Sequence, residues 1–160
     1  MPLSDLLTAD RIVLLVEPRD RDAVMDAAAR LLADSAPAST TAIGDCLRQR
    51  ERLGSTAIGH GVAIPHGRSN MFDSARAAFL RLQNPVDFDA GDGVPVDLVF
   101  AMVVPEHFTQ QHLQLLSELA EAFADPGFRE TLRAAQDVDA LRVTLLDGLP
   151  ATATANQRTA

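Results

Sequence analysis

Apolar residues in this chain follow two different periods, and the two alternate along the sequence. Continuous apolar runs at 11–17 and 98–104 are typical of buried strands, and 75–82 is a run with polar residues on one side. Apolar residues recur at helical spacing in five further segments, at 20–33, 41–52, 110–124, 129–135 and 137–147. This alternation predicts an α/β fold, a single domain with a mixed β-sheet flanked by helices.

Turn and cap residues set the expected boundaries. The domain is expected to span 1–150, and the tail at 151–160 lacks apolar periodicity and is expected to be disordered. Turns or loops are predicted in four places: 34–40, Asn84-Pro85, Asp92-Gly93 and 125–128. Helix N-caps are predicted at Ser4 for a short turn over 2–9, at Ser39 or Thr40, and at Thr109.

The composition fits a globular domain and limits its partners. The 160 residues carry a formal net charge of −8 and a pI of about 4.8, and 47% of them are hydrophobic. Proteins that bind nucleic acids or anionic membranes normally carry a basic surface, so we expect neither as a partner. An acidic chain instead favours a protein partner with a basic docking face.

Cysteine usage and the start of the chain indicate the compartment. The single cysteine, Cys46, excludes an internal disulfide and favours a reducing environment. The opening residues MPLSDLL lack the basic and apolar regions of a signal peptide, and no apolar run is long enough to span a bilayer. We therefore expect a cytoplasmic protein without a membrane segment of its own.

The segment 50–68, RERLGSTAIGHGVAIPHGR, concentrates the candidate chemistry. It is rich in Gly and holds His60 and His66, two of the four histidines. Pro65 extends the backbone ahead of His66, and Gly67 leaves the imidazole sterically open. The chain contains no Lys, Tyr or Trp, so a lysine Schiff base and a tyrosine nucleophile are impossible. A histidine is therefore the natural nucleophile or base.

Two further polar residues fall on apolar helix faces. Arg50 extends a face made of Ile43, Cys46 and Leu47. An inward arginine is costly unless it meets an anion, so Arg50 is either a snorkelling or ion-paired structural residue or a ligand for a phosphoryl or carboxylate group. His112 begins a stripe at the N-terminus of its helix, followed by Leu115, Leu116, Leu119 and Phe123. It is either a satisfied core histidine or part of an anion site.

With these residues in place, the chain resembles enzyme IIA of the bacterial phosphotransferase system. The resemblance is to the fructose/mannitol class, and within it to the stand-alone nitrogen-regulatory branch. It extends from about residue 4 to about 148 and rests on three motifs in order: RERLGSTAIGHGVAIPHGR (50–68), PVDFDAGDGVPVDLVFAMVVP (85–105) and QQHLQLLSELAEAF (110–123).

The resemblance implies roles for five residues. His66, in the A-I-P-H-G motif, is the expected phosphoryl acceptor, with either ring nitrogen open as the site, and His112 is expected beside it. Arg50, which precedes the Ser-Thr pair, and the hydroxyls of Ser55 and Thr56 are expected to bind phosphate. No metal and no organic cofactor are implied. His60 stands where close nitrogen-type relatives usually carry Asn, and we interpret this replacement as neutral.

The resemblance also implies partners. The donor is expected to be a phosphohistidine carrier of the HPr or NPr type. The phosphorylated or unmodified protein then binds downstream regulatory proteins, or the phosphoryl group passes to a IIB component in sugar transport. The sequence contains no fused IIB or IIC segment, which favours the regulatory role.

Two other functions are alternatives to phosphoryl transfer. The first is a metal site made of the four histidines, His60, His66, His107 and His112, whose spacing matches no zinc motif. The second is a binding module that is not phosphorylated, which the joint presence of His66, His112 and Arg50 disfavours.

Overall fold

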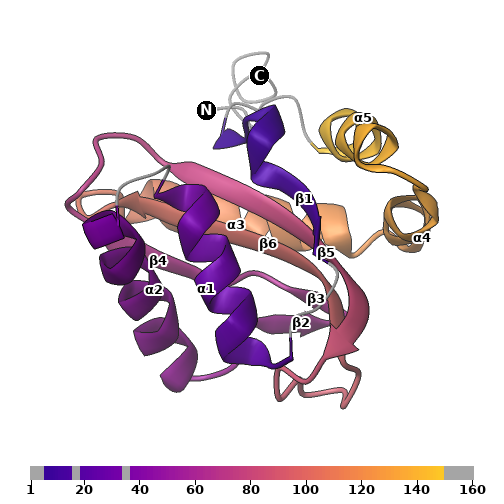
Figure 1. The fold of residues 1–160 in the computed structure, drawn as a ribbon, viewed down its shortest axis with the longest axis horizontal. Coiled ribbons are helices and arrows are strands. Elements are labelled where there is room, and N and C mark those ends of the chain that lie inside the picture. The colour runs from indigo at the N-terminus through magenta and orange to yellow at the C-terminus, as the bar shows by residue number, and fades with distance from the viewer. Residues whose placement is uncertain (1–5, 16–18, 34–36, 150–160) are drawn as a thin grey trace.

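The computed structural model describes residues 6–15, 19–33 and 37–149, and within them one six-stranded sheet runs in the order β1-β5-β6-β3-β2, with β4 also paired to β6 (Figure 1). The strands are β1 (Ile12–Leu15), β2 (Ala57–Gly59), β3 (Val62–Ala63), β4 (His66–Ser69), β5 (Arg76–Val86) and β6 (Val96–Pro105). A 3-10 turn, η2 (Ala9–Arg11), precedes β1, and the helices are α1 (Arg21–Leu32), α2 (Pro37–Arg52), α3 (Gln110–Phe123), α4 (Pro126–Ala134) and α5 (Val138–Gly148). The predicted α/β class and mixed sheet are confirmed.

The strand β6 is the centre of the sheet and is buried on both faces. It pairs antiparallel with β5 and parallel with β3 and β4. Alternate residues such as Phe100 and Met102 join a core with α3, α4 and α5, while Val99 and Ala101 join a second core with α1 and α2. Helices α1 and α2 lie in front of the sheet and α3 lies behind it (Figure 1). The prediction of a continuously apolar central strand is confirmed.

Two helices begin earlier than predicted. Helix α2 starts at Pro37, so Ser39 and Thr40 lie inside it and the prediction that either caps it is wrong. Helix α4 starts at Pro126, with the Asp125 side chain accepting a hydrogen bond from the Gly127 amide, so 125–128 is a helix start and not a turn. The reason is the same in both cases, because proline is well suited to the first helical turn, where its missing N–H costs nothing.

The predicted turn at Asn84-Pro85 is also wrong, because β5 continues to Val86. Among the described residues, pairing with β1 extends to Leu82, and the register with β6 shifts between Arg81 and Val86. A proline is tolerated at such an irregular strand end. The turn predicted at Asp92-Gly93 lies between β5 and β6, and Gly93 there has a positive φ of 73°.

The sequence did not predict that the glycine-rich segment contains three short strands. Strands β2 and β3 form an antiparallel hairpin whose two turn residues, His60 and Gly61, have φ of 59° and 80°. Asn and His are both enriched among residues with such left-handed backbones, which supports the neutral interpretation of His60. Thr109 occupies the N-cap position of α3 without a side-chain cap bond. The predictions for Ser4, for 16–17 and for the tail at 151–160 lie outside the described residues.

Candidate phosphoryl-transfer site

Strand β4 begins with His66, whose ring is held at both nitrogens. Nδ1 lies 2.7 Å from the carbonyl oxygen of Ile64. The Arg50 guanidinium donates from Nε to Nε2 of His66 over 3.3 Å, and donates from Nη1 to the Gly54 carbonyl over 2.8 Å. A carbonyl can only accept, so Nδ1 carries the proton and Nε2 keeps its lone pair.

The next residue, Gly67, allows β4 to lie directly against α2. A Cβ added at Gly67 would overlap with the Sγ of Cys46, whose thiol donates to the Arg68 carbonyl over 3.3 Å. Burial is the main reason that the pKa of the Cys46 thiol is raised. The close approach matters because it brings Arg50, one turn further along α2, within reach of His66.

His112 is placed beside His66 by the first turn of α3. It is buried, with 8% of its surface exposed, and the two imidazole rings meet edge to face with centroids 5.1 Å apart. Its Nε2 is buried without a hydrogen-bond partner among the described residues. The pKa of His112 is lowered to about 4, mainly by burial, with the neighbouring charges of His66, Arg68 and Arg50 acting in the same direction.

The environment of His66 also favours the neutral ring. Burial lowers its pKa most, and the neighbouring charge of Arg50 acts in the same direction. The hydrogen bond to Ile64 and the charge of Glu51 oppose this shift and raise the pKa. Both histidines are therefore neutral near pH 7, which leaves Nε2 of His66 able to attack an electrophile.

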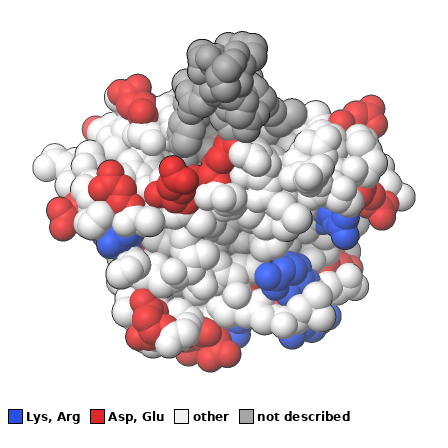
Figure 2. All heavy atoms as spheres, turned by 180° about the vertical axis from the view of Figure 1, so that it is seen from behind, with Lys and Arg blue, Asp and Glu red and all other residues white. Residues whose placement is uncertain are grey.

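Both rings open into a cleft of about 990 Å³ between α2, β4 and the start of α3. Three arginines line it, Arg50, Arg52 and Arg68, with Glu106 as the acidic residue. On the face seen from behind, acidic side chains are spread out and most of the visible arginines lie to one side (Figure 2). The local charge of the cleft thus differs from the net charge of −8, and the cleft is suited to an anion such as a phosphoryl group.

Ser55 and Thr56, which were expected to bind phosphate, do not line this cleft. The Ser55 hydroxyl donates to the Phe88 carbonyl and accepts from the Ala57 amide over 3.1 Å. The Thr56 hydroxyl donates to a carboxylate oxygen of Glu51 over 2.6 Å. Direct phosphate binding by these two hydroxyls therefore stays a prediction, and their hydrogen bonds in this structure serve the loop itself.

Sequence reasoning missed Arg68 as a residue of the cleft. It follows His66 by two positions on β4, so both side chains point to the same side of the strand. The two-residue spacing of His66 and Arg68 is visible in the sequence, but it indicates a shared face only once β4 is known to be a strand.

The four histidines do not form a common cluster. His60 is at the β2–β3 turn, and the ring of His107 packs against Phe108. Across the described residues, no three His, Cys, Asp or Glu side chains are placed to share a metal ion. The described helices also include none with the length and apolar character needed to span a bilayer.

Comparison with known proteins gives a consistent set of relatives. Residues 5–147 match the family described as phosphoenolpyruvate-dependent sugar phosphotransferase system, EIIA 2. The chain is 40% identical over 146 residues to a nitrogen regulatory protein of Pseudomonas aeruginosa, covering 91% of this chain and 95% of that protein. It is 36% identical over 153 residues to a nitrogen regulatory protein of Bradyrhizobium diazoefficiens, covering 96% of this chain and 99% of that protein.

A solved structure supports the same relationship. The crystal structure of nitrogen regulatory protein IIA-Ntr from Neisseria meningitidis matches with a TM-score of 0.81 at 37% identity, covering 89% of this chain and 98% of that one. The resemblance inferred from the three sequence motifs is thereby confirmed.

Proposed function

The chain belongs to the EIIA type 2 family of the phosphoenolpyruvate-dependent sugar phosphotransferase system, and we propose that it is a cytoplasmic phosphocarrier that accepts a phosphoryl group on His66. One observation carries the proposal. The Nε2 of His66 keeps its lone pair and faces a guanidinium in an arginine-lined cleft, while Nδ1 is tied to the Ile64 carbonyl. We therefore assign Nε2 as the phosphoryl acceptor.

The transfer is an in-line exchange between two imidazoles. The N–P bond of the donor phosphohistidine breaks, its electron pair returns to the donor nitrogen, and Nε2 of His66 forms the new N–P bond. The proton on Nδ1 stays in place, because the Ile64 carbonyl continues to accept it. The protein contributes mainly position and charge, as expected for phosphoryl transfer.

The residues around His66 have separate roles in this proposal. Arg50, which bonds to Nε2 before transfer, moves its donors onto the phosphoryl oxygens, and Arg68 supplies a second positive charge. The unpartnered Nε2 of His112 binds the arriving group, and the negative charge there raises the pKa of His112 so that it becomes a cationic donor. Ser55 and Thr56 support the loop between α2 and β2, and their hydroxyls would reach a phosphoryl group in the cleft only if this loop rearranged.

The donor is proposed to be an HPr- or NPr-like phosphohistidine carrier that covers the cleft. Two exposed leucines lie among the lining residues, Leu53 with 85% and Leu113 with 67% of its surface exposed. Exposed apolar side chains beside a charged reaction centre suit a protein partner that excludes water as it docks. The arginines of the rim favour acidic groups on the partner at this point, whatever the charge of its wider face.

After phosphorylation, we propose a mainly regulatory role in which downstream proteins recognise the phosphorylation state. The support is the similarity to nitrogen regulatory proteins along nearly their whole length. Transfer to a separate IIB component is the second candidate, because the matching family is described as a sugar phosphotransferase system. The two differ in outcome, since only the second predicts fast loss of the phosphoryl group to a purified IIB protein.

The test is the intact mass of the chain after incubation with phosphoenolpyruvate, enzyme I and an HPr-type carrier. We expect one added phosphoryl group that is labile in acid and is absent from His66→Ala. The matched control is His107→Ala, which removes an exposed histidine outside the cleft and is expected to be phosphorylated like the wild type. No added mass with a competent donor set would leave a binding module as the better description.

A further inference from the structure

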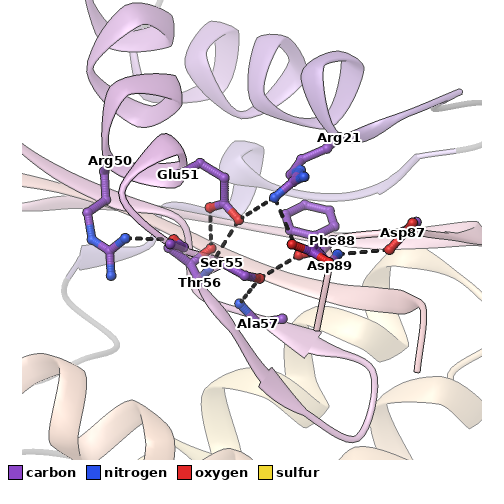
Figure 3. Close-up of polar contacts among 10 residues, drawn as sticks. Arg21, Arg50, Glu51, Ser55, Thr56, Ala57, Asp87, Phe88 and Asp89 are labelled. Carbon is purple, nitrogen blue, oxygen red and sulfur yellow. Dashed lines mark hydrogen bonds and ion pairs between the residues drawn. The ribbon is translucent and has the colours of Figure 1, made fainter. Parts of the chain in front are cut away.

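Glu51 is a buried carboxylate that the proposed transfer does not use directly. Only 8% of its surface is exposed, and it is the one acidic residue classed as buried within the described part of the chain. It follows Arg50 on α2 but points away from it, toward Thr56 and Arg21 (Figure 3). Burying a carboxylate has a considerable free-energy cost unless hydrogen-bond donors surround it. The donors that surround Glu51 therefore indicate its role.

Both oxygens of Glu51 are occupied by donors from two other parts of the chain. Oε1 accepts from the Thr56 hydroxyl over 2.6 Å. Oε2 accepts from the Thr56 amide over 3.0 Å and from Nη1 of Arg21 on α1 over 3.2 Å. Glu51 therefore fixes Thr56 at two points, its amide and its side chain, directly after the turn that ends α2.

Thr56 in turn fixes the peptide that controls the His66 ring. The Thr56 carbonyl accepts from the Ile64 amide over 3.0 Å. The Ile64 carbonyl lies 2.7 Å from Nδ1 of His66 and is the group that keeps the proton on that nitrogen. An unbroken path of hydrogen bonds and backbone thus leads from Glu51 through Thr56 and Ile64 to the imidazole.

A second set of hydrogen bonds connects the same loop to the Phe88 carbonyl. Nη1 of Arg21 also donates to the Phe88 carbonyl over 3.4 Å, and the Ser55 hydroxyl donates to the same carbonyl (Figure 3). The loop before β2 is therefore joined to α1 and to the segment after β5. The charge of Glu51 also favours the protonated form of His66, in opposition to Arg50.

We propose that Glu51 is a positioning residue for phosphoryl transfer, which holds the Ile64 carbonyl against Nδ1 of His66 so that Nε2 remains unprotonated and able to act as the nucleophile. The effect of Glu51 on the rate of phosphoryl transfer rests on the proposed function, whereas its effect on the protonation of the His66 imidazole does not. A misplaced carbonyl would let the proton exchange between the two ring nitrogens. The protonated Nε2 of the minor tautomer cannot attack.

The test is the ¹⁵N NMR spectrum of the His66 ring in the unphosphorylated protein at pH 8, where the imidazole is neutral. In the wild type we expect one protonated and one bare nitrogen with well-separated shifts. In Glu51→Gln, which keeps the size of the side chain but removes its charge and one acceptor, we expect the two shifts to move toward each other. Glu130→Gln, which removes an exposed carboxylate on α4, is expected to match the wild type.

A role in folding alone predicts a different result. It predicts a lower melting temperature for Glu51→Gln with unchanged His66 shifts, and that result would overturn the proposal. If Glu51→Gln does not fold, Thr56→Val removes only the 2.6 Å hydroxyl bond and keeps the amide bond. It is expected to move the shifts in the same direction by less, and unchanged shifts in a folded Thr56→Val would equally contradict the proposal.

Transfer kinetics give the catalytic part of the test. We expect the single-turnover phosphorylation rate of Glu51→Gln to fall by about tenfold at saturating donor, with the donor concentration for half-saturation unchanged. Equal rates in variant and wild type would refute the positioning role. A wild type that takes no phosphoryl group would refute the proposed function instead, and the ring shifts would still decide whether Glu51 positions His66.

Discussion

The proposed chemistry depends on the two nitrogens of one imidazole having different partners. In His66, Nδ1 lies against the Ile64 carbonyl and Nε2 faces the Arg50 guanidinium. The carbonyl requires a proton on Nδ1, and the guanidinium requires a lone pair on Nε2, so both contacts select the same tautomer. The ring is thereby prepared before any phosphoryl group arrives, which reduces the reorganisation needed during transfer.

His112 leads to a prediction about stability and pH. Its pKa is lowered to about 4 in the folded protein from an ordinary value of 6.5. Between these values the unfolded chain binds a proton that the folded chain does not, so this contribution to stability is present above pH 6.5 and is lost as the pH falls. We expect the unfolding free energy of the wild type to fall by about 2 kcal/mol more than that of His112→Gln between pH 7 and pH 5.

Urea unfolding at the two pH values measures this difference. His107→Gln is the control, because it removes an exposed histidine that lies outside the cleft. It is expected to lose as much stability as the wild type. Parallel losses in His112→Gln and the wild type would show that His112 is not held neutral by the fold.

At the residue scale, the sequence was most informative where helices present the site. The positions of Arg50 and His112 on apolar helix faces could be predicted because a helical period reveals which side of a helix is buried. Arg68 and Glu51 could not be found in this way. Arg68 depends on the short strand β4, and the role of Glu51 depends on contacts with Arg21 and Thr56 that no local pattern encodes.

At the scale of elements, the site depends on the contact between α2 and β4. Gly67 lies against Cys46, with no room for a side chain between them. We expect Gly67→Ala to destabilise the fold by about 1 to 3 kcal/mol and to slow phosphorylation, because the added methyl group must push β4 and His66 away from α2 and Arg50.

A double-mutant cycle tests whether this contact is the cause. Cys46→Ala removes the Sγ that the new methyl group would meet. It is therefore expected to restore part of both the stability and the rate in the background of Gly67→Ala. Additive losses in the double variant, measured by thermal unfolding and single-turnover transfer, would mean that the cost arises elsewhere.

The elements that escaped prediction are short or begin with proline. Strands β2, β3 and β4 have 3, 2 and 4 residues, too few for a period of two to be recognised among glycines. Pro37 and Pro126 were interpreted as turn residues, although each stands in the first turn of a helix. The long apolar strand β6 and the helices α1, α3 and α5 were predicted well because tertiary packing follows their apolar pattern.

At the scale of the whole molecule, charge and apolar surface are distributed unevenly. The chain carries a net charge of −8, yet three arginines line the cleft that contains both histidines. Net charge alone predicted a basic partner and could not reveal this local reversal, because it depends on how α2 and β4 are packed together. The cleft with its exposed leucines is therefore the expected docking face.

This distribution predicts separate effects on docking and chemistry. Leu53→Ser and Leu113→Ser should each raise the donor concentration for half-saturation by several-fold, with the rate at saturation unchanged, because they remove apolar contact area without touching His66. The matched control is Val143→Ser, an apolar residue on α5 that is 60% exposed and lies outside the cleft lining. Steady-state transfer kinetics measure both quantities, and equal effects of all three substitutions would argue against this docking face.

The most direct test of the account is the position of the phosphoryl group on the ring. The phosphorylated protein, labelled with ¹⁵N at histidine, would be studied by NMR for coupling between phosphorus and a ring nitrogen. We predict that phosphorus couples to Nε2 of His66, with Nδ1 still protonated against the Ile64 carbonyl. Coupling to Nδ1 of His66, or to a nitrogen of any other histidine, would contradict it.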